Sequence, residues 1–216
     1  MKQFVVIGLG RFGASIASTL YGLGNDVLGI DIDEEIIQYM ADQITHAVQA
    51  DATDEGALKA LGVRNFDVAI VSIGQDIQAS ILVTLILKEL GLKYVVAKAQ
   101  NELHGKVLYK IGADRVVFPE RDMGVRVAHN LVSTSVLDYI ELSPDFSIVE
   151  IEPIPEWHDK TLGQLDIREK YGLNIMAIKR NEDVIISPKA KDYIFKGDIL
   201  FVVGENKDIE KLEKRF

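Results

Sequence analysis

The sequence has no cysteine, a single tryptophan and only 5 prolines among 216 residues. Without cysteine, the chain cannot form disulfides or thiolate metal sites. It also lacks an excess of positive charge, since the formal net charge is −9 at pH 7 and the lysines and arginines are scattered among acids. No basic stripe is present to follow a phosphate backbone, which argues against a nucleic-acid partner.

A long hydrophobic run is lacking as well. The most apolar segment, residues 77–92, is shorter than the ~20 residues that cross a bilayer, and it includes Gln78, Lys88 and Glu89. We expect a helix buried against a sheet in place of a membrane span. The first strand begins near Gln3, which leaves no room for a secretory leader, so we expect a cytosolic protein.

The chain is rich in apolar residues, which make up 48% of it, enough to build sizeable cores. Short β-branched runs alternate with helical patterns, and such apolar strands are typical of a parallel sheet with helices on both faces. We predict a doubly wound, Rossmann-like α/β domain of about six strands. The expected strands are 4–8, 26–30, 46–50, 67–74, 93–99 and 115–118, and the expected helices are 11–23, 33–43, 54–60, 75–90, 102–110 and one from residue 120.

Beyond Leu142 the segments become shorter, and three of the five prolines fall between residues 144 and 155. The sequence Arg180-Asn181-Glu182-Asp183 predicts a hairpin, which implies antiparallel pairing. We predict a small α+β domain of about 70 residues, with residues 1–137 and 138–216 forming the two domains. Its expected strands are 146–152, 173–180, 183–188 and 198–204, and its expected helices are 161–171 and one from residue 205.

The segment between the two domains has helical periodicity from Pro119 onward. Pro119 suits a first helical turn, and the acids Glu120 and Asp122 suit its positive end. The apolar residues that recur at helical spacing are Val125, Val127, Ala128, Leu131, Val132, Val136 and Leu137. This surface needs cover, and either the second domain or a second subunit could provide it, because periodicity does not distinguish them.

The first strand leads into the glycine pattern Gly8-Leu9-Gly10-Arg11-Phe12-Gly13 and then into a helix. This setting is typical of a dinucleotide pyrophosphate on a helix N-terminus. Arg11 is unexpected there, because a guanidinium forms forked bonds best with phosphate oxygens that are free. We interpret Phe12 as a packing residue at the start of the helix.

Asp31 ends the second expected strand, where a carboxylate accepts hydrogen bonds from ribose hydroxyls. The alternative is a tight turn whose glycines serve packing alone. Ligands also gather at the carboxyl ends of neighbouring strands. Asp51-Ala52-Thr53 and Ser72-Ile73-Gly74 follow two such strands, so both could line the adenosine, although Asp51 and Thr53 could equally cap the next helix.

Catalytic groups are not recognisable. Tyr94 and Lys98 have the spacing of a dehydrogenase pair, but four residues along a strand separate side chains by ~13 Å, so they cannot share a proton. The histidines are dispersed and form no cluster that would hold a metal; they are His46, His104, His129 and His158. We expect no enzyme activity, and we keep an NAD(H)-dependent oxidoreductase or an NADH-binding redox sensor as alternatives.

Several stretches together resemble one family. They are GLGRFG with Asp31, IGQDIQASILVTLILKELG, KAQNELHGKVLYKIGADRVVFPERDMG, and LDIREKYGLNIMAIKR with the later ISP. With them the chain resembles the cytosolic regulatory subunits of Ktr and Trk potassium uptake systems. These proteins carry a nucleotide-binding RCK domain followed by a small C-terminal RCK domain.

The resemblance implies ATP or ADP as the ligand, with NAD(H) in some members. It implies that Arg11 reaches terminal phosphate oxygens, of its own nucleotide or of one across a dimer, and that Asp31 holds the ribose. It implies that Glu120 helps hold Mg²⁺ or another divalent cation, although Glu120 also suits a helix N-terminus. The nucleotide-binding residues are expected to be Gly8, Gly10, Arg11, Phe12, Gly13, Asp31, Ile32, Asp51, Ala52, Thr53, Ile73, Gly74 and Lys98.

In the second domain the resemblance implies a cyclic di-AMP site at a dimer cleft. Arg168 would bond a phosphate, and apolar side chains would pack against adenine. The alternative is that these are core residues and a solvated arginine. The stretch begins at Leu165, and the expected residues are Asp166, Ile167, Arg168, Asn174, Ile175 and Pro188.

The expected function is that of a non-enzymatic gating subunit. The resemblance implies homodimers that assemble into an octameric ring beneath an integral-membrane potassium channel, at the inner face of the cell membrane. ATP and ADP would favour different ring shapes, and a ligand shifts such an equilibrium only by its differential affinity.

Overall fold

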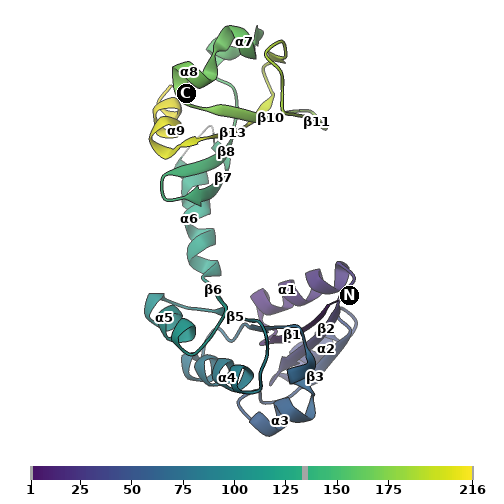
Figure 1. The fold of residues 1–216 in the computed structure, drawn as a ribbon. Coiled ribbons are helices and arrows are strands. Elements are labelled where there is room, and N and C mark those ends of the chain that lie inside the picture. The colour runs from purple at the N-terminus through teal and green to yellow at the C-terminus, as the bar shows by residue number, and fades with distance from the viewer. Residues whose placement is uncertain (1, 133–135, 216) are drawn as a thin grey trace. The chain divides into compact units, whose positions relative to one another are not determined.

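The computed structural model describes residues 2–132 and 136–215, and the chain divides into two compact units, Met1–Glu120 and Arg121–Phe216 (Figure 1). Each unit has its own apolar core. Helix α6 (Pro119–Val132) begins in the first unit and continues in the second. The predicted domain boundary between residues 137 and 138 stays a prediction.

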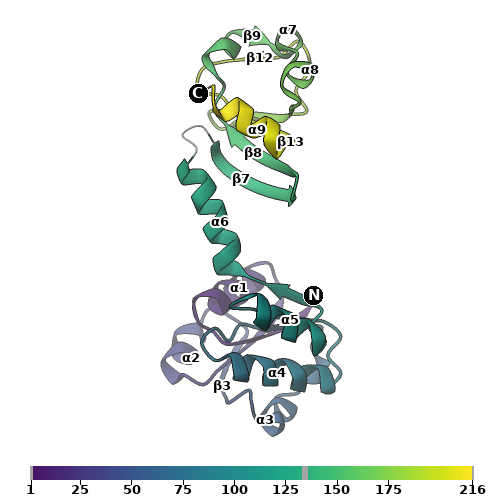
Figure 2. The ribbon, with the colours of Figure 1, turned by 90° about the vertical axis from the view of Figure 1, so that its left-hand side faces the viewer.

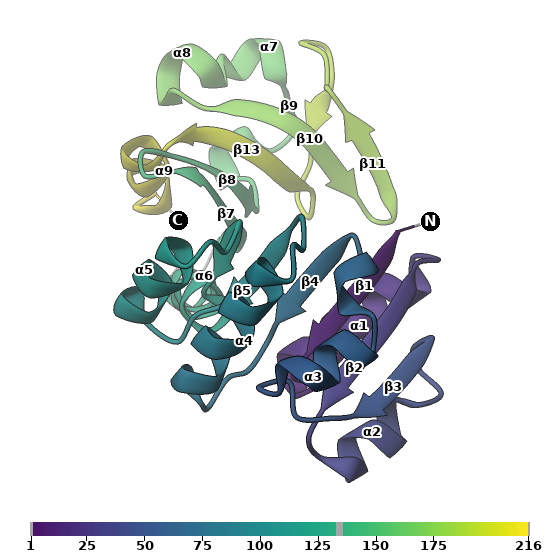
Figure 3. The same ribbon diagram turned by 60° about the horizontal axis from the view of Figure 1, so that its bottom comes forward.

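The first unit is built on a six-stranded sheet in which every strand pair is parallel, as Figure 3 shows for β1 to β4. The strand order is β3-β2-β1-β4-β5-β6, so the topology reverses between β1 and β4. In open sheets of this kind, ligands bind beyond the carboxyl ends of the strands at such a reversal. The strands are β1 (Gln3–Ile7), β2 (Asp26–Asp31), β3 (His46–Gln49), β4 (Val68–Val71), β5 (Val95–Lys98) and β6 (Arg115–Val117).

Helices cover both faces of this sheet because its strands are apolar on both sides. Val5 and Ile7 point into one core with Leu58 and Leu87, and Val6 points into the other with Ala17. The prediction of a doubly wound α/β domain is confirmed. The helices are α1 (Arg11–Gly22), α2 (Glu34–Met40), α3 (Glu55–Ala60), α4 (Ile77–Glu89) and α5 (Glu102–Lys110), with a 3-10 turn, η1 (Val63–Asn65).

Residues 77–89 of the apolar segment form α4, which buries Val83, Ile86 and Leu87 in the core. The prediction of a core helix is therefore confirmed. Within residues 2–132 and 136–215, no helix is both long enough and apolar enough to cross a membrane.

The second unit holds a five-stranded sheet in the order β11-β10-β13-β8-β7, all antiparallel, and a two-stranded sheet of β12 and β9. The hairpin predicted at 180–183 is confirmed, since Arg180 pairs with Asp183 and Asn181 has a φ of 54°. The strands are β7 (Val136–Ser143), β8 (Phe146–Ile151), β9 (Lys160–Thr161), β10 (Asn174–Arg180), β11 (Asp183–Ile186), β12 (Tyr193–Ile194) and β13 (Ile199–Glu205). The helical segments are η2 (Pro155–Trp157), α7 (Leu162–Leu165), α8 (Ile167–Tyr171) and α9 (Asn206–Glu213).

Strand β7 corrects the predicted helix that was to include Val136 and Leu137. Both residues belong to β7, which Figure 2 shows beside β8 as a hairpin. Pairing of Tyr139 with Val149 outweighs the helical spacing of the apolar residues, as tertiary context often does. The structure does not describe the side chains of His129, Val132 and Val136.

The predicted helix 161–171 is interrupted at Asp166, which has a φ of 48°. Leu165 and Ile167 on either side of it are both buried in the core. Residues two apart point to different sides of a continuous helix. The left-handed turn at Asp166 therefore lets both side chains enter the same core.

Candidate functional site

The glycine loop between β1 and α1 is set by close backbone contacts. A Cβ at Gly13 would lie 1.9 Å from the carbonyl oxygen of Gly8, so no side chain fits there. Gly8 has a φ of 89°, and a Cβ on it would lie 3.0 Å from the Ser72 backbone. Gly10 differs, because nothing lies within 4 Å of its Cβ position. Two glycines thus serve packing, and the third leaves the loop open to a ligand.

The N-terminus of α1 is not capped by a side chain. Its N-cap is Gly10, and its first turn contains no acid. In contrast, α2 to α5 begin after side chains that accept a hydrogen bond from the first turn, namely Asp33, Asp54, Asp76 and Asn101. The first N–H groups of α1 are therefore available to an anion, which the helix dipole also favours.

Asp31 connects the end of β2 to the glycine loop. Its carboxylate accepts hydrogen bonds from the N–H of Leu9 at 2.6 Å and from the N–H of Asp33 at 3.0 Å. The packing alternative thus accounts for Asp31 as well. Each carboxylate oxygen can accept a further bond, which leaves Asp31 able to bind ribose hydroxyls. Ile32 beside it is exposed, as an apolar contact for adenine would be.

Residues 51–53 follow β3 and lie next to the end of β2, where the N–H of Ala50 donates to the Asp31 carbonyl at 2.9 Å. The hydroxyl and the N–H of Thr53 both donate to Asp51, which lowers the pKa of that carboxyl. The cap of α3 is Asp54, so the alternative of Asp51 or Thr53 as helix cap is wrong. Ala52 is buried in the core.

Lys98, the last residue of β5, lies among several predicted site residues. Its Nζ donates to the carboxylate of Glu120, and this hydrogen bond lowers the pKa of Glu120. The same Nζ is 5.7 Å from the ring centroid of Phe12 and 3.4 Å from the Cβ position of Gly74. Phe12 therefore contacts a cation in addition to its predicted packing role. Ile73 packs against the core beside Gly74.

Arg11 is the first residue of α1 and is exposed. Within the described ranges it has no hydrogen bond or ion pair. The uncapped helix end, Arg11 and Lys98 thus place positive charge at the carboxyl edge of the sheet, where only Lys98 is already paired.

A divalent cation would have few protein ligands at this edge. In the part of the chain that the structure describes, no group of three or more histidines or acids could hold a metal ion. Glu120 offers a carboxylate, which is bonded to Lys98. Mg²⁺ commonly uses one or two carboxylates together with phosphate oxygens and waters. Glu120 therefore fits Mg²⁺ only together with the phosphates of a ligand.

Sequence reasoning missed Gln100 as part of this site. Gln100 donates a side-chain hydrogen bond to the carbonyl of Gly74. Ser72, which was expected to line the site, is buried against the glycine loop. Gln100 is two residues beyond Lys98, so the strand alternation could have placed the two side chains on one face.

In the second unit, some of the residues expected to bind cyclic di-AMP are buried and others are exposed. Ile167 is 5% exposed and belongs to the core, and Ile175 packs against that core. Arg168 on α8 and Asn174 at the start of β10 are exposed. Pro188 is brought to β10 by the N–H of Ser187, which donates to the Met176 carbonyl at 2.8 Å. For Ile167, the alternative that these residues belong to the core is therefore correct.

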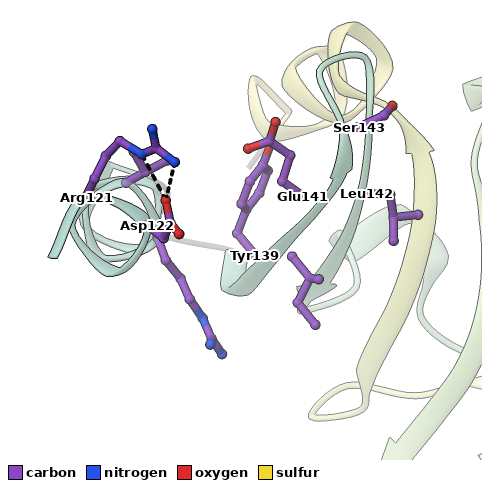
Figure 4. A pocket seen from close by; sticks show the side chains of 9 residues that line it. Arg121, Asp122, Tyr139, Glu141, Leu142 and Ser143 are labelled. Carbon is purple, nitrogen blue, oxygen red and sulfur yellow. Dashed lines mark hydrogen bonds and ion pairs between the residues drawn. The ribbon is translucent and has the colours of Figure 1, made fainter. Parts of the chain in front are cut away.

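A cavity of about 590 Å³ lies between α6 and β7 (Figure 4). Charged and apolar side chains both line it, including the ion-paired Arg121 and Asp122 on α6 and Leu142 on β7. None of the predicted ligand-binding residues lines it. The cavity lies along part of the apolar segment that was expected to be covered by the second domain or by a second subunit.

Comparison with known proteins shows two domain families in the chain. The TrkA-N domain matches residues 4–119, and the TrkA-C domain matches residues 146–216. The Ktr system potassium uptake protein C of Bacillus subtilis is 56% identical over 99% of this chain and 97% of its own length. The Ktr system potassium uptake protein A of the same organism is 50% identical over 98% of this chain and 96% of its own length.

Solved structures have a similar fold. The GsuK RCK domain covers 99% of this chain, which spans 47% of that chain, with a TM-score of 0.71 and 20% identity. A structure of GsuK bound to ADP covers 61% of this chain and 34% of its own, with a TM-score of 0.53 and 29% identity.

The close relatives are potassium uptake proteins and not enzymes, which confirms the expectation of a non-enzymatic chain. The resemblance predicted from the sequence motifs is confirmed as well. With a TrkA-N domain, a TrkA-C domain and 56% identity over nearly the whole chain, the protein belongs to the family of Ktr system potassium uptake proteins.

Proposed function

We propose that the protein is a regulatory subunit of a potassium uptake system, which binds ATP and ADP at the glycine loop and gates a channel subunit in the membrane. The names of the relatives support the potassium uptake system. The ADP complex of GsuK, which is 29% identical to this chain, supports an adenine nucleotide.

One observation carries the choice of ligand: the uncapped N-terminus of α1 begins with the exposed, unpaired Arg11, within the described residues. Backbone N–H groups and the helix dipole suffice for a pyrophosphate between two nucleosides. A guanidinium adds forked bonds to terminal phosphate oxygens, which ATP and ADP have and NAD(H) lacks. In this proposal Asp31 binds the ribose, Ile32 contacts adenine and Arg11 contacts the terminal phosphate.

Glu120 would complete a Mg²⁺ site with the phosphates of ATP. ATP then brings both a longer phosphate chain and a cation, so its affinity for each conformation differs from that of ADP. A nearly complete shift between two conformations requires ~10⁴-fold discrimination.

Assembly is part of the proposal. Met123, Val127 and Leu131 on α6 are exposed apolar residues, which suit a helix that pairs with a second copy of the chain. Homodimers would assemble into an octameric ring on the cytoplasmic side of the membrane, where they meet the potassium channel. The cyclic di-AMP site at Arg168 and its neighbours stays a prediction.

Thermal unfolding with separate ligands tests the proposal. ATP with Mg²⁺, ADP, NADH and cyclic di-AMP are compared, since a ligand at 100 times its dissociation constant stabilises the folded state by ~2.7 kcal/mol. ATP and ADP are expected to raise the unfolding temperature, and NADH is not. Stabilisation by NADH alone would instead identify a redox sensor or an oxidoreductase.

A further inference from the structure

The ion pair between Lys98 and Glu120 joins two parts of the fold. Lys98 ends β5 at the carboxyl edge of the sheet. Glu120 is the second residue of α6 and the last residue of the first unit, and the rest of α6 belongs to the second unit. The pair therefore holds the first turn of α6 to the edge of the sheet where the nucleotide is proposed to bind.

The two partners differ in their access to water. The side chain of Lys98 is 11% exposed, whereas that of Glu120 is 69% exposed. A lysine whose side chain is largely buried needs an anion for its ammonium, because burial removes part of the water around that group. Glu120 can return to solvent at little cost. A competing anion would therefore displace Glu120 while Lys98 stays in place.

Lys98 already lies where such an anion would bind. Its Nζ is 5.7 Å from the ring of Phe12 in the first turn of α1, and 3.4 Å from the Cβ position of Gly74. The uncapped N-terminus of α1 attracts the same anion. A nucleotide phosphate carries more charge than a carboxylate, and lysine binds it as a compact point charge.

We infer that Lys98 exchanges Glu120 for a phosphate of the bound nucleotide, so that the ion pair between Lys98 and Glu120 holds the first turn of α6 to the sheet only while the site contains no phosphate. The inference rests on the proposed function, because it requires a nucleotide at this site. It adds the step by which binding reaches α6: one ion pair replaces another, and the helix loses its ion pair with the edge of the sheet.

Affinity for ADP tests the exchange, measured on the full-length protein in EDTA so that no cation bridges Glu120 and the nucleotide. Glu120→Gln removes the competitor for Lys98, and the affinity is expected to rise about two- to fivefold, the size of a partly exposed ion pair. Lys98→Met is expected to lower it about tenfold or more. Adding Glu120→Gln to Lys98→Met should change nothing further, because no competition remains.

Lys88→Met is the matched control. It breaks the ion pair of Lys88 with Asp114, whose N···O distance is 2.9 Å, at the opposite end of β5. It should leave the affinity for ADP unchanged.

Amide hydrogen exchange over residues 118–126 gives a second readout. Without nucleotide, Lys98→Met and Glu120→Gln should both speed exchange in the first turns of α6, and Lys88→Met should not. ADP should speed the same exchange in the wild type but not in the two variants.

The outcomes separate the inference from the proposed function. If the wild type does not bind ADP, both fail. If the wild type binds ADP but Glu120→Gln leaves the affinity and the exchange unchanged, or weakens ADP, the exchange of partners is disproved while the nucleotide site stands.

Discussion

Arg11 is the residue at which ATP and ADP should differ most. It is exposed at the start of α1, and a guanidinium there can bond a third phosphate that ADP lacks. We expect Arg11→Ala to weaken ATP about tenfold and ADP clearly less, measured by calorimetric titration with Mg²⁺. Arg64→Ala, which removes an exposed arginine from η1, is the control. Equal losses for both nucleotides would remove the proposed role.

His104 makes stability depend on pH. Burial lowers the pKa of His104, whose Nδ1 accepts a hydrogen bond from the Gln100 N–H at 3.3 Å. The pKa of His104 is near 6.5 in the unfolded chain and lower in the folded protein. As the pH falls below about 6.5 the unfolded chain therefore takes up the proton first, and the folded state loses stability. We expect the unfolding free energy to fall from pH 7 to 5.5, and His104→Gln to flatten this slope.

At this scale the sequence could predict the residues of the glycine loop and Asp31, because they follow one another along a short stretch of chain. It could not predict that Lys98 pairs with Glu120, since 22 residues separate them and their contact depends on β5 and β6 being neighbours. Nor could it show that Asp31 bonds the loop itself.

Among the elements, α1 depends on its glycines in different ways. Gly13→Ala would place a methyl group 1.9 Å from the Gly8 carbonyl. We expect it to lower the unfolding free energy by about 3 kcal/mol or more, because α1 must move off β1. Gly10→Ala adds a methyl group in open space and should leave stability within about 1 kcal/mol. Urea unfolding followed by circular dichroism measures both, and a stable Gly13→Ala would contradict the packing account.

Arg180, at the end of β10 where the hairpin to β11 begins, forms an ion pair with the buried Asp198, just before β13. Arg180 donates two bonds of 2.8 Å to Asp198, which is 1% exposed. Burial raises the pKa of Asp198, but the bonds from Arg180 and from the Phe195 N–H outweigh it and hold the pKa below its usual range. Asp198→Asn should cost about 3 kcal/mol, measured by urea unfolding. Asp183→Asn, at an exposed position of the same hairpin, should cost little.

Elements with their own boundary signals could be predicted, and those defined by pairing could not. Helices α2 to α5 follow capping residues, so the sequence shows where they begin. Strand β7 has apolar spacing that also suits a helix, and only pairing with β8 decides its state. The helix break at Asp166 likewise depends on tertiary packing, because it lets Leu165 and Ile167 enter one core.

For the whole molecule, two separately packed units predict two unfolding transitions. Trp157 is the only tryptophan of the sequence and is buried in the second unit. We expect ADP to shift the transition seen by far-ultraviolet circular dichroism, and to leave that seen by tryptophan fluorescence unchanged, because ADP is proposed to bind the first unit alone. An equal shift of both signals would show that the units unfold together.

The fold class of the first unit could be predicted from the alternation of strands and helices, and the antiparallel pairing of the second from its hairpin signal. The division of the chain at Glu120 could not be predicted, because α6 continues through it and the helical pattern does not change there. Partners and assembly are a property of surfaces, and periodicity alone leaves open what covers α6.

The continuity of α6 makes it a lever arm. A helix of 14 residues is about 21 Å long, so a tilt of about 10° at its first turn moves its last turn by about 4 Å. The ion pair of Glu120 with Lys98 lies at the first turn, about which such a tilt would occur. A local change at one carboxylate can therefore be amplified mechanically into a displacement as large as a residue, without any rearrangement inside the sheet.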